Sequence, residues 1–193
     1  MNMVQVYIKG QEDKELSSFL RYYPVRIKNI GMDAFFDRQV IYDFKDGRNH
    51  SDVAKCVAKM LVKKFGRKVR SVVFSCVSAS SQERNEARNK NFSELVCKFS
   101  GAINGFSYVK VVGERTAVHG TKVKKDEREK RLKEKNNIEV DANFFKNKIV
   151  CIWDDVVTTG TSFCAYTAQL EQVGAHVTNG IFLGKTSYKY VQQ

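Results

Sequence analysis

The segment that most constrains the fold runs from Lys148 to Phe163 and reads KIVCIWDDVVTTGTSF. Its first part, Ile149 to Trp153, is a short, unbroken run of apolar residues, which is typical of a strand covered on both faces in a parallel sheet. Two acids and a Thr-rich turn follow, and the apolar spacing then changes to that of a helix that ends near Gly174. The segment therefore predicts a strand, a tight turn and a helix, in that order.

This predicted turn has the features of a phosphate site. A strand that feeds a helix through a tight turn brings free backbone N–H groups and the positive end of the helix dipole to one point, which favours an anion. The Thr and Ser hydroxyls add hydrogen-bond donors, and Gly160 permits a positive φ. Asp154 and Asp155 need a different partner, because carboxylates repel a phosphate ligand. Ribose hydroxyls together with Mg²⁺ are their natural complement.

The same residues carry a family resemblance. A hydrophobic strand, two acids, two small apolar residues and Thr-Thr-Gly-Thr resemble the phosphoribosyl pyrophosphate (PRPP) binding motif of type I phosphoribosyltransferases. The resemblance implies that Asp154 and Asp155 contact the ribose, act in catalysis and face Mg²⁺ indirectly, through ribose or water. It also implies a site for the 5′-phosphate made of Val157, Thr158, Thr159, Gly160, Thr161 and Ser162. An ordinary turn with Thr present by chance is the alternative.

A second small-residue loop follows another predicted strand, Ser71 to Val77. Small hydroxyl residues after a parallel strand leave the backbone N–H groups accessible to an anion, although a plain Ser-rich turn is the alternative. Beside the first motif we expect a pyrophosphate site here, made of Ser78, Ala79, Ser80 and Arg84.

The most polar part of the chain runs from Gly113 to Lys135. It is either an exposed helix with i,i+4 ion pairs or a mobile basic lid that closes over pyrophosphate and excludes water. The lid interpretation places it at residues 115–125 and makes Arg115 and Lys122 catalytic candidates. Other cations expected to meet the pyrophosphate are His119, Lys124, Lys45 and Arg84.

A narrower resemblance, over residues 42–186, is to the ComF-type competence branch of the phosphoribosyltransferases, whose members are also similar to amidophosphoribosyltransferases. It is carried by Phe44-Lys45-Asp46-Gly47, by Arg84, Arg88, Asn91 and Phe92, and by Glu127-Arg128 and Arg131. This chain departs from the branch in three respects: Ser and Ala replace prolines in the pyrophosphate loop, Lys90 stands where Gly is usual, and the zinc module is missing. The five cysteines include no C-x-x-C pair.

The whole chain of 193 residues predicts one α/β domain: a mainly parallel, twisted sheet with helices on both faces and its ligand at the carboxyl ends of the strands. The type I resemblance adds a small N-terminal hood, at about residues 1–45, to a core at about 46–193. Further strands are expected at Val4–Ile8, Tyr108–Val112 and His176–Leu183, with Lys185 and Tyr188 at the carboxyl edge. Helices are expected at 53–65, capped by Ser51 or Asp52, and around 92–99.

The net charge of +12 fits a solvated basic face, a polyanionic substrate such as PRPP, or nucleic acid. No apolar run is long enough to span a bilayer and the first residues lack the layout of a signal peptide, so we expect a cytoplasmic protein that does not bind a membrane. The type I resemblance also implies a homodimer.

The expected function is transfer of a 5-phosphoribosyl group from PRPP, with Mg²⁺, to an unidentified small-molecule nitrogen nucleophile, with release of pyrophosphate. That reaction would make the protein a pentosyltransferase, although no residue stands out as a general base. The alternative is a non-catalytic PRPP sensor whose basic surface binds nucleic acid or a protein partner.

Overall fold

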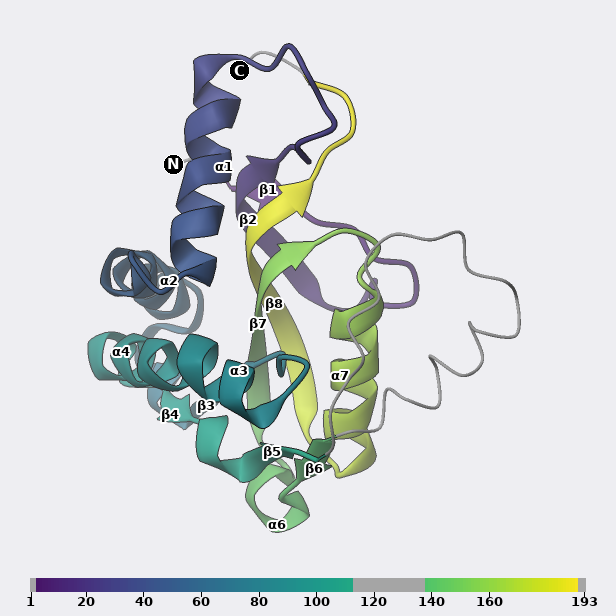
Figure 1. Cartoon of the computed structure of the whole chain (residues 1–193). Helices are drawn as coiled ribbons and strands as arrows, with labels where there is room; N and C mark the ends of the chain where they lie inside the picture. Colours follow the sequence, from purple (N-terminus) through teal and green to yellow (C-terminus); the bar gives the residue numbers. More distant parts are fainter. Residues whose placement is uncertain (1–2, 113–137, 191–193) are drawn as a thin grey trace.

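A six-stranded sheet forms the centre of the structure, a computed structural model that describes residues 3–112 and 138–190 (Figure 1). All neighbouring strands in it are parallel except the edge pair β1 and β2. In spatial order the strands are β1 (Val4–Gln5), β2 (Glu15–Tyr22), β8 (His176–Thr186), β7 (Ile149–Val157), β3 (Val72–Cys76) and β4 (Ile103–Asn104). The fold is therefore mixed α/β with a mostly parallel central sheet, as predicted.

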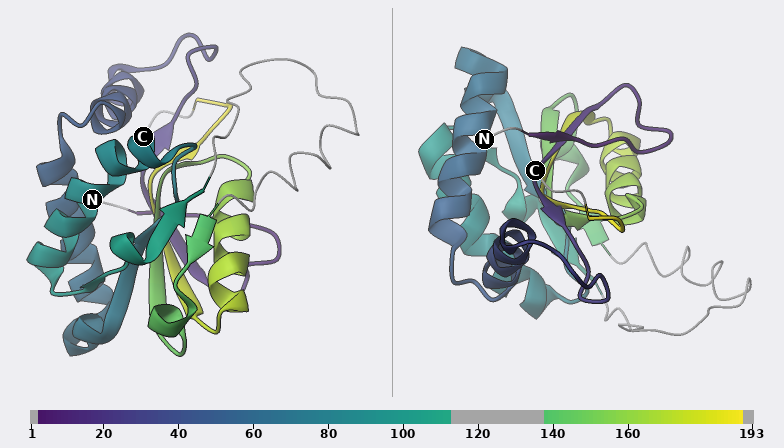
Figure 2. Two further views of the ribbon diagram at one scale, coloured as in Figure 1. Left: turned by 60° about the horizontal axis from the view of Figure 1, so that its bottom comes forward. Right: turned by 90° about the horizontal axis from the view of Figure 1, so that it is seen from above.

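Helices cover both faces of this sheet (Figure 2). The helices α1 (Met32–Lys45), α2 (His50–Phe65) and α4 (Asn91–Ser100) pack on one face, and α7 (Thr161–Gln172) packs on the other. Short helical turns connect them: η1 (Gly66–Ser71), α3 (Gln82–Asn85), η2 (Glu86–Lys90), η3 (Phe106–Tyr108) and α6 (Ala142–Phe145). In the described ranges, no helix combines the length and the apolar character needed to cross a membrane.

Alternation along β7 shows why both faces are closed. Cys151 and Trp153 pack into the cluster beneath α1, α2 and α4, whereas Val150 and Ile152 pack into the cluster beneath α7. Successive side chains of a strand point to opposite faces, so an unbroken apolar strand needs cover on both sides. The prediction of a doubly covered strand is confirmed for residues 150–153, whereas Ile149 is exposed.

The helices predicted from apolar spacing are present. In α7 the buried residues include Phe163, Tyr166 and Leu170, and Gly174 follows the helix with φ of 84°. The predicted helix at 53–65 is α2, but the cap was wrong. Asn49 is the N-cap of α2 and makes no capping hydrogen bond with its side chain, because the helix begins earlier than its apolar stripe indicates.

Three strands differ from the expectations, and two of them, β2 and β5, matter for the fold. β2 lies inside the central sheet, parallel to β8, so part of the segment expected to form a hood belongs to the core sheet. The predicted strand at 108–112 is β5 (Val109–Val111), which pairs antiparallel with β6 (Ile138–Val140) in a separate two-stranded sheet. The strand expected at residues 4–8 is limited to β1.

Candidate functional site

The carboxyl ends of β3, β7 and β8 meet at one edge of the sheet, because these strands are parallel neighbours. Cys76 is paired with Trp153, so the loop that leaves β3 begins beside the two acids. Val157 is paired with Lys185, so the turn that leaves β7 begins beside the end of β8. This edge is where open parallel α/β sheets place their ligands.

The turn between β7 and α7 encloses a cavity of about 150 Å³. Gly160 is the N-cap of α7, and no side chain caps the helix there. The first N–H groups of a helix have no partner within it, and together with the helix dipole they favour an anion. All six residues expected to hold the 5′-phosphate line this cavity: Val157, Thr158, Thr159, Gly160, Thr161 and Ser162.

Gly160 determines the shape of the turn. Its φ of 81° lies in the left-handed region, as the sequence predicted. A Cβ atom at this position would lie 2.7 Å from the side chain of Ile8, so any larger residue would collide with the N-terminal segment. Glycine is needed here for both its conformation and its size.

The hydroxyl groups of the turn are held by short contacts. Thr158 Oγ1 lies 2.7 Å from Thr186 Oγ1, and Thr159 Oγ1 lies 2.9 Å from Thr161 Oγ1. Lys185 Nζ donates a hydrogen bond of 3.0 Å to the carbonyl oxygen of Thr158, which places its charge at the predicted edge. Tyr188, the other residue expected there, is exposed and its ring lies 5.0 Å from the guanidinium carbon of Arg26.

Asp154 and Asp155 occupy the last part of β7 rather than the loop that follows it. Asp154 lines the cavity, and its Oδ1 accepts a hydrogen bond from the backbone N–H of Asp155 at 2.9 Å. The side chain of Asp155 is turned towards α1 and η2, where its Oδ2 lies 3.2 Å from Arg88 Nη1 and 3.9 Å from Lys45 Nζ. The two carboxylates are therefore in different surroundings although they are adjacent in sequence.

The surroundings of Asp154 disfavour its charged form. Burial raises the pKa of this carboxyl well above its usual range, and the neighbouring charge of Asp155 acts in the same direction. A cation or a set of hydroxyl donors at Asp154 would offset part of the free-energy cost of keeping this carboxylate charged. Adjacent carboxylate oxygens suit Mg²⁺, which binds one or two carboxylates and keeps waters and substrate phosphates as its other ligands.

Lys45 and Arg88 reach Asp155 from two separate parts of the chain. Lys45 is the last residue of α1 and was expected to meet pyrophosphate. Arg88, in η2, was named in the sequence analysis only as one of the residues that carry the ComF-type resemblance. The two segments that carry that resemblance, 44–47 and 84–92, therefore converge on one carboxylate. No spacing rule in the sequence brings these segments together.

An aromatic cluster is formed by residues close in sequence to this ion-pair group. The ring of Phe44 lies 5.5 Å from Trp153 and 4.9 Å from Phe92. Phe44 directly precedes Lys45, and Trp153 directly precedes Asp154. His50 packs against the same cluster, with its Nε2 lying 2.9 Å from the carbonyl oxygen of Phe44. Burial lowers the pKa of His50, and the charge of Arg88 lowers it further. The contact with the Phe44 carbonyl oxygen acts on this pKa in the opposite direction.

The loop after β3 has a different internal arrangement. The backbone N–H of Ala79 donates to Asn85 Oδ1 at 3.1 Å, and the backbone N–H of Arg84 donates to Ser81 Oγ at 3.3 Å. The Arg84 guanidinium donates to Ser80 Oγ at 3.3 Å. The hydroxyl oxygen of Ser78 is buried and has no hydrogen-bond partner among the described residues.

Part of the predicted site lies outside the described residues. The lid candidates Arg115, His119, Lys122 and Lys124 all fall within residues 113–137. The described part of the site therefore consists of the Thr turn, the acid pair, the Ser loop and the two cations at Asp155.

Comparison with known proteins adds no family assignment. A scan against protein-family models finds no match, and a search of curated proteins finds none at a significant level.

Proposed function

We propose that this protein is a phosphoribosyltransferase with the type I fold, which uses PRPP and Mg²⁺ to transfer a 5-phosphoribosyl group to a nitrogen nucleophile. One observation carries the proposal: Asp154 and the complete Thr turn line a single cavity at the carboxyl edge of the sheet. An anion site beside a carboxylate suits a ligand that carries both a phosphate and hydroxyl groups. A ribose 5-phosphate unit has this combination.

In the proposed reaction the bond between C1′ and the pyrophosphate oxygen breaks, and its electron pair leaves with pyrophosphate. The acceptor nitrogen forms the new bond to C1′ and loses a proton. Catalysis would rest mainly on positioning and on charge stabilisation. Bound Mg²⁺ would neutralise charge on the leaving pyrophosphate.

The chain's own residues divide this work between them. The Thr turn would hold the 5′-phosphate, and the acid pair would hold the ribose hydroxyls and support positive charge at C1′. Lys45 and Arg88 are suited to the pyrophosphate end, since both lie at Asp155. Ser78 remains a prediction for this end. Arg84, Arg115 and Lys122 remain predictions for the same end.

The second candidate function is a PRPP sensor without turnover. It is favoured by the pairing of Asp155 with Arg88 and Lys45, which engages a carboxylate that the transferase reaction needs. Sensor and enzyme would share the cavity and differ only in whether pyrophosphate is released.

Calorimetric titration with PRPP, with and without Mg²⁺, tests the site. We expect Mg²⁺-dependent binding to the native protein and its loss in the Asp154→Asn/Asp155→Asn double variant. For the turn we expect Thr159→Val/Thr161→Val to lose binding of ribose 5-phosphate, while Thr178→Val, an exposed Thr at the opposite end of β8, leaves it unchanged. Absence of binding by the folded native protein would overturn both candidate functions.

Pyrophosphate release separates the two candidates. A protein that binds PRPP and releases pyrophosphate with one member of a panel of nitrogen acceptors is the transferase. Binding without release across the panel supports the sensor.

A further inference from the structure

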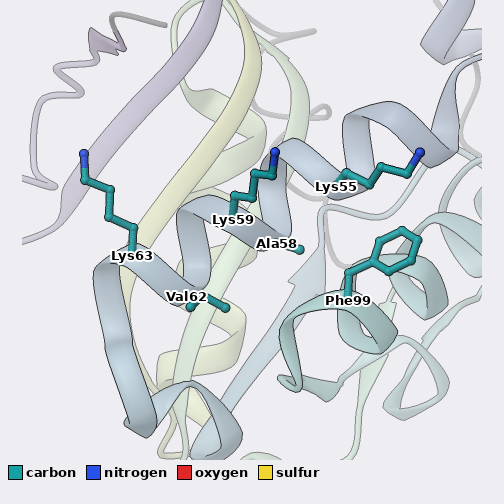
Figure 3. A pocket seen from close by; sticks show the side chains of 6 residues that line it. All are labelled: Lys55, Ala58, Lys59, Val62, Lys63 and Phe99. Carbon is teal, nitrogen blue, oxygen red and sulfur yellow. The ribbon is translucent and has the colours of Figure 1, made fainter.

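A second concave site lies on the outer surface of the helical layer, away from the carboxyl edge. It is a groove of about 460 Å³ between α2 and α4 (Figure 3). The residues that line it are Lys55, Ala58, Lys59, Val62, Lys63 and Phe99. None of them takes part in the proposed PRPP site, so the groove needs an explanation of its own.

Three lysines form one side of this groove. Lys55, Lys59 and Lys63 follow each other at intervals of four residues on α2, and Figure 3 shows their side chains extending towards the same side. A helix rises 1.5 Å per residue, so the row repeats at about 6 Å. This interval is comparable to the spacing of successive phosphates along an extended nucleic-acid strand.

The charge of the row is available to a ligand. All three lysines are exposed. Lys55 pairs with Asp52 at 3.0 Å, but both side chains are exposed and such pairs contribute little. Among the described residues, no carboxylate pairs with Lys59 or Lys63.

The surrounding sequence strengthens this positive potential. From Val53 to Gln82 the chain contains no Asp or Glu. Just beyond the row, η1 adds three exposed cations, namely Arg67, Lys68 and Arg70. These exposed cations, in a chain of net charge +12, are suited to a polyanion.

The remaining lining is apolar and includes an exposed ring. Phe99 lines the groove from α4, with its ring at the Lys55 end of the lysine row, and is 41% exposed (Figure 3). Val62 is 45% exposed beside it. An exposed aromatic face beside spaced cations matches single-stranded nucleic acid, whose phosphates pair with the cations while a base stacks on the ring. A groove is also concave, whereas entry into a duplex groove requires a protruding element.

We propose that the groove between α2 and α4 binds single-stranded nucleic acid, with phosphates along Lys55, Lys59 and Lys63 and a base stacked on Phe99. This inference does not depend on phosphoribosyl transfer, because the two sites share no residue.

Fluorescence anisotropy with a labelled 12-nucleotide oligothymidine, measured over a range of salt concentrations, tests the proposal. We expect Lys55→Gln/Lys59→Gln/Lys63→Gln to weaken binding at least tenfold. The slope of log affinity against log salt should fall by about 2, since each phosphate contact in a single strand contributes about 0.7. The matched control, Lys28→Gln/Lys146→Gln/Lys148→Gln, removes the same charge at exposed positions outside the groove and should change affinity less than threefold.

The ring is tested separately by Phe99→Leu, which keeps an apolar side chain but removes the stacking surface. We expect a loss of roughly tenfold, in keeping with about 1–3 kcal/mol per stacked base. Equal losses in the two lysine variants would overturn the proposal, because general charge would then explain the binding. Binding of a polyglutamate peptide without binding of the oligonucleotide would also overturn it, in favour of an acidic protein partner.

Discussion

Two loops leave neighbouring parallel strands at the same edge of the sheet and are built from similar small residues, yet they are stabilised differently. In the Ser loop after β3, side chains of the loop and of α3 accept the backbone N–H groups of Ala79 and Arg84. In the Thr turn after β7, α7 begins at Gly160 without a capping side chain. The Ser loop therefore engages two of its backbone donors with its own side chains, whereas the Thr turn leaves the first N–H groups of α7 for a ligand.

This difference shows what makes a small-residue loop an anion site. Composition alone does not distinguish the two loops, since hydroxyl residues follow the strand in both. What distinguishes them is the presence of a side-chain acceptor: Asn85 is buried at the Ser loop, and no equivalent side chain caps α7. We therefore expect substitutions in the Thr turn to affect ligand binding and loss of the acceptor Asn85 to affect folding, with Gly160 as an exception that affects both.

The largest effect on the free energy of unfolding is expected for Gly160→Ala. The left-handed backbone costs a non-Gly residue about 1–2 kcal/mol, and overpacking against Ile8 adds about 1–3 kcal/mol. The free energy of unfolding in urea should therefore fall by roughly 2–5 kcal/mol. Binding of ribose 5-phosphate should weaken as the turn is displaced.

Gly101→Ala is the matched control for this prediction. Its φ of 80° is nearly the same, but the nearest atom to an added Cβ is Arg70 Cγ at 3.7 Å, an ordinary contact. We expect a loss of only about 1–2 kcal/mol from the backbone. The loss caused by Gly160→Ala should be smaller in an Ile8→Ala background than in the native protein, since the added Cβ no longer meets the Ile8 side chain. Equal losses for the two glycines in the native background would show that the contact with Ile8 is unimportant.

The next largest effect is expected for Asn85→Ala in the Ser loop. This change leaves the N–H of Ala79 and the amide of Asn89 without their common acceptor. An unsatisfied buried polar group costs about 1–3 kcal/mol, so the midpoint of urea unfolding should fall accordingly. Asn91→Ala, at an exposed position in α4, should be nearly neutral. A neutral Asn85→Ala variant would contradict the contrast between the loops.

The order of the elements around the Thr turn could be predicted from sequence because every signal there is local. The apolar run of β7, the glycine and the helical spacing of α7 all lie within one short segment. β2 was not predicted, because its local sequence pattern does not indicate a buried strand. Ser17 and Ser18 interrupt its apolar pattern, and only the structure shows that they are buried, with the hydroxyl of Ser18 bonded to the carbonyl oxygen of Leu20.

The contacts around Asp155 could not be derived from spacing either. Arg88 lies 67 positions before Asp155, and Lys45 belongs to a helix that the sequence did not predict. Exposed Met32, Phe35 and Phe36 obscure the amphipathic pattern of α1. Tertiary packing, rather than any local preference, brings these cations to the acid pair.

For Asp154→Asn we expect a smaller effect on the free energy of unfolding, and an increase rather than a decrease. Because the pKa of Asp154 is raised in the folded protein, the native state binds more protons than the unfolded state above the ordinary Asp pKa of about 4. Its contribution to stability therefore falls as pH rises through that window. Urea unfolding at pH 4 and pH 7 should show the variant gaining stability over the native protein at the higher pH. A gain that does not depend on pH would contradict this account.

The smallest effect on stability is expected for Arg84→Gln. This variant also tests whether the Ser loop takes part in binding the pyrophosphate of PRPP. Arg84 is exposed and its guanidinium makes one hydrogen bond of 3.3 Å, so the free energy of unfolding should change by less than about 0.5 kcal/mol. If its charge meets the pyrophosphate, affinity for PRPP should fall roughly three- to fivefold, as for other exposed ion pairs, while affinity for ribose 5-phosphate stays the same. Arg67→Gln, at an exposed site in η1, provides the charge-matched control and should change neither affinity. Equal weakening of both ligands by Arg84→Gln would mean that the arginine acts through the general potential of the edge, and the Ser loop would then have only a structural role.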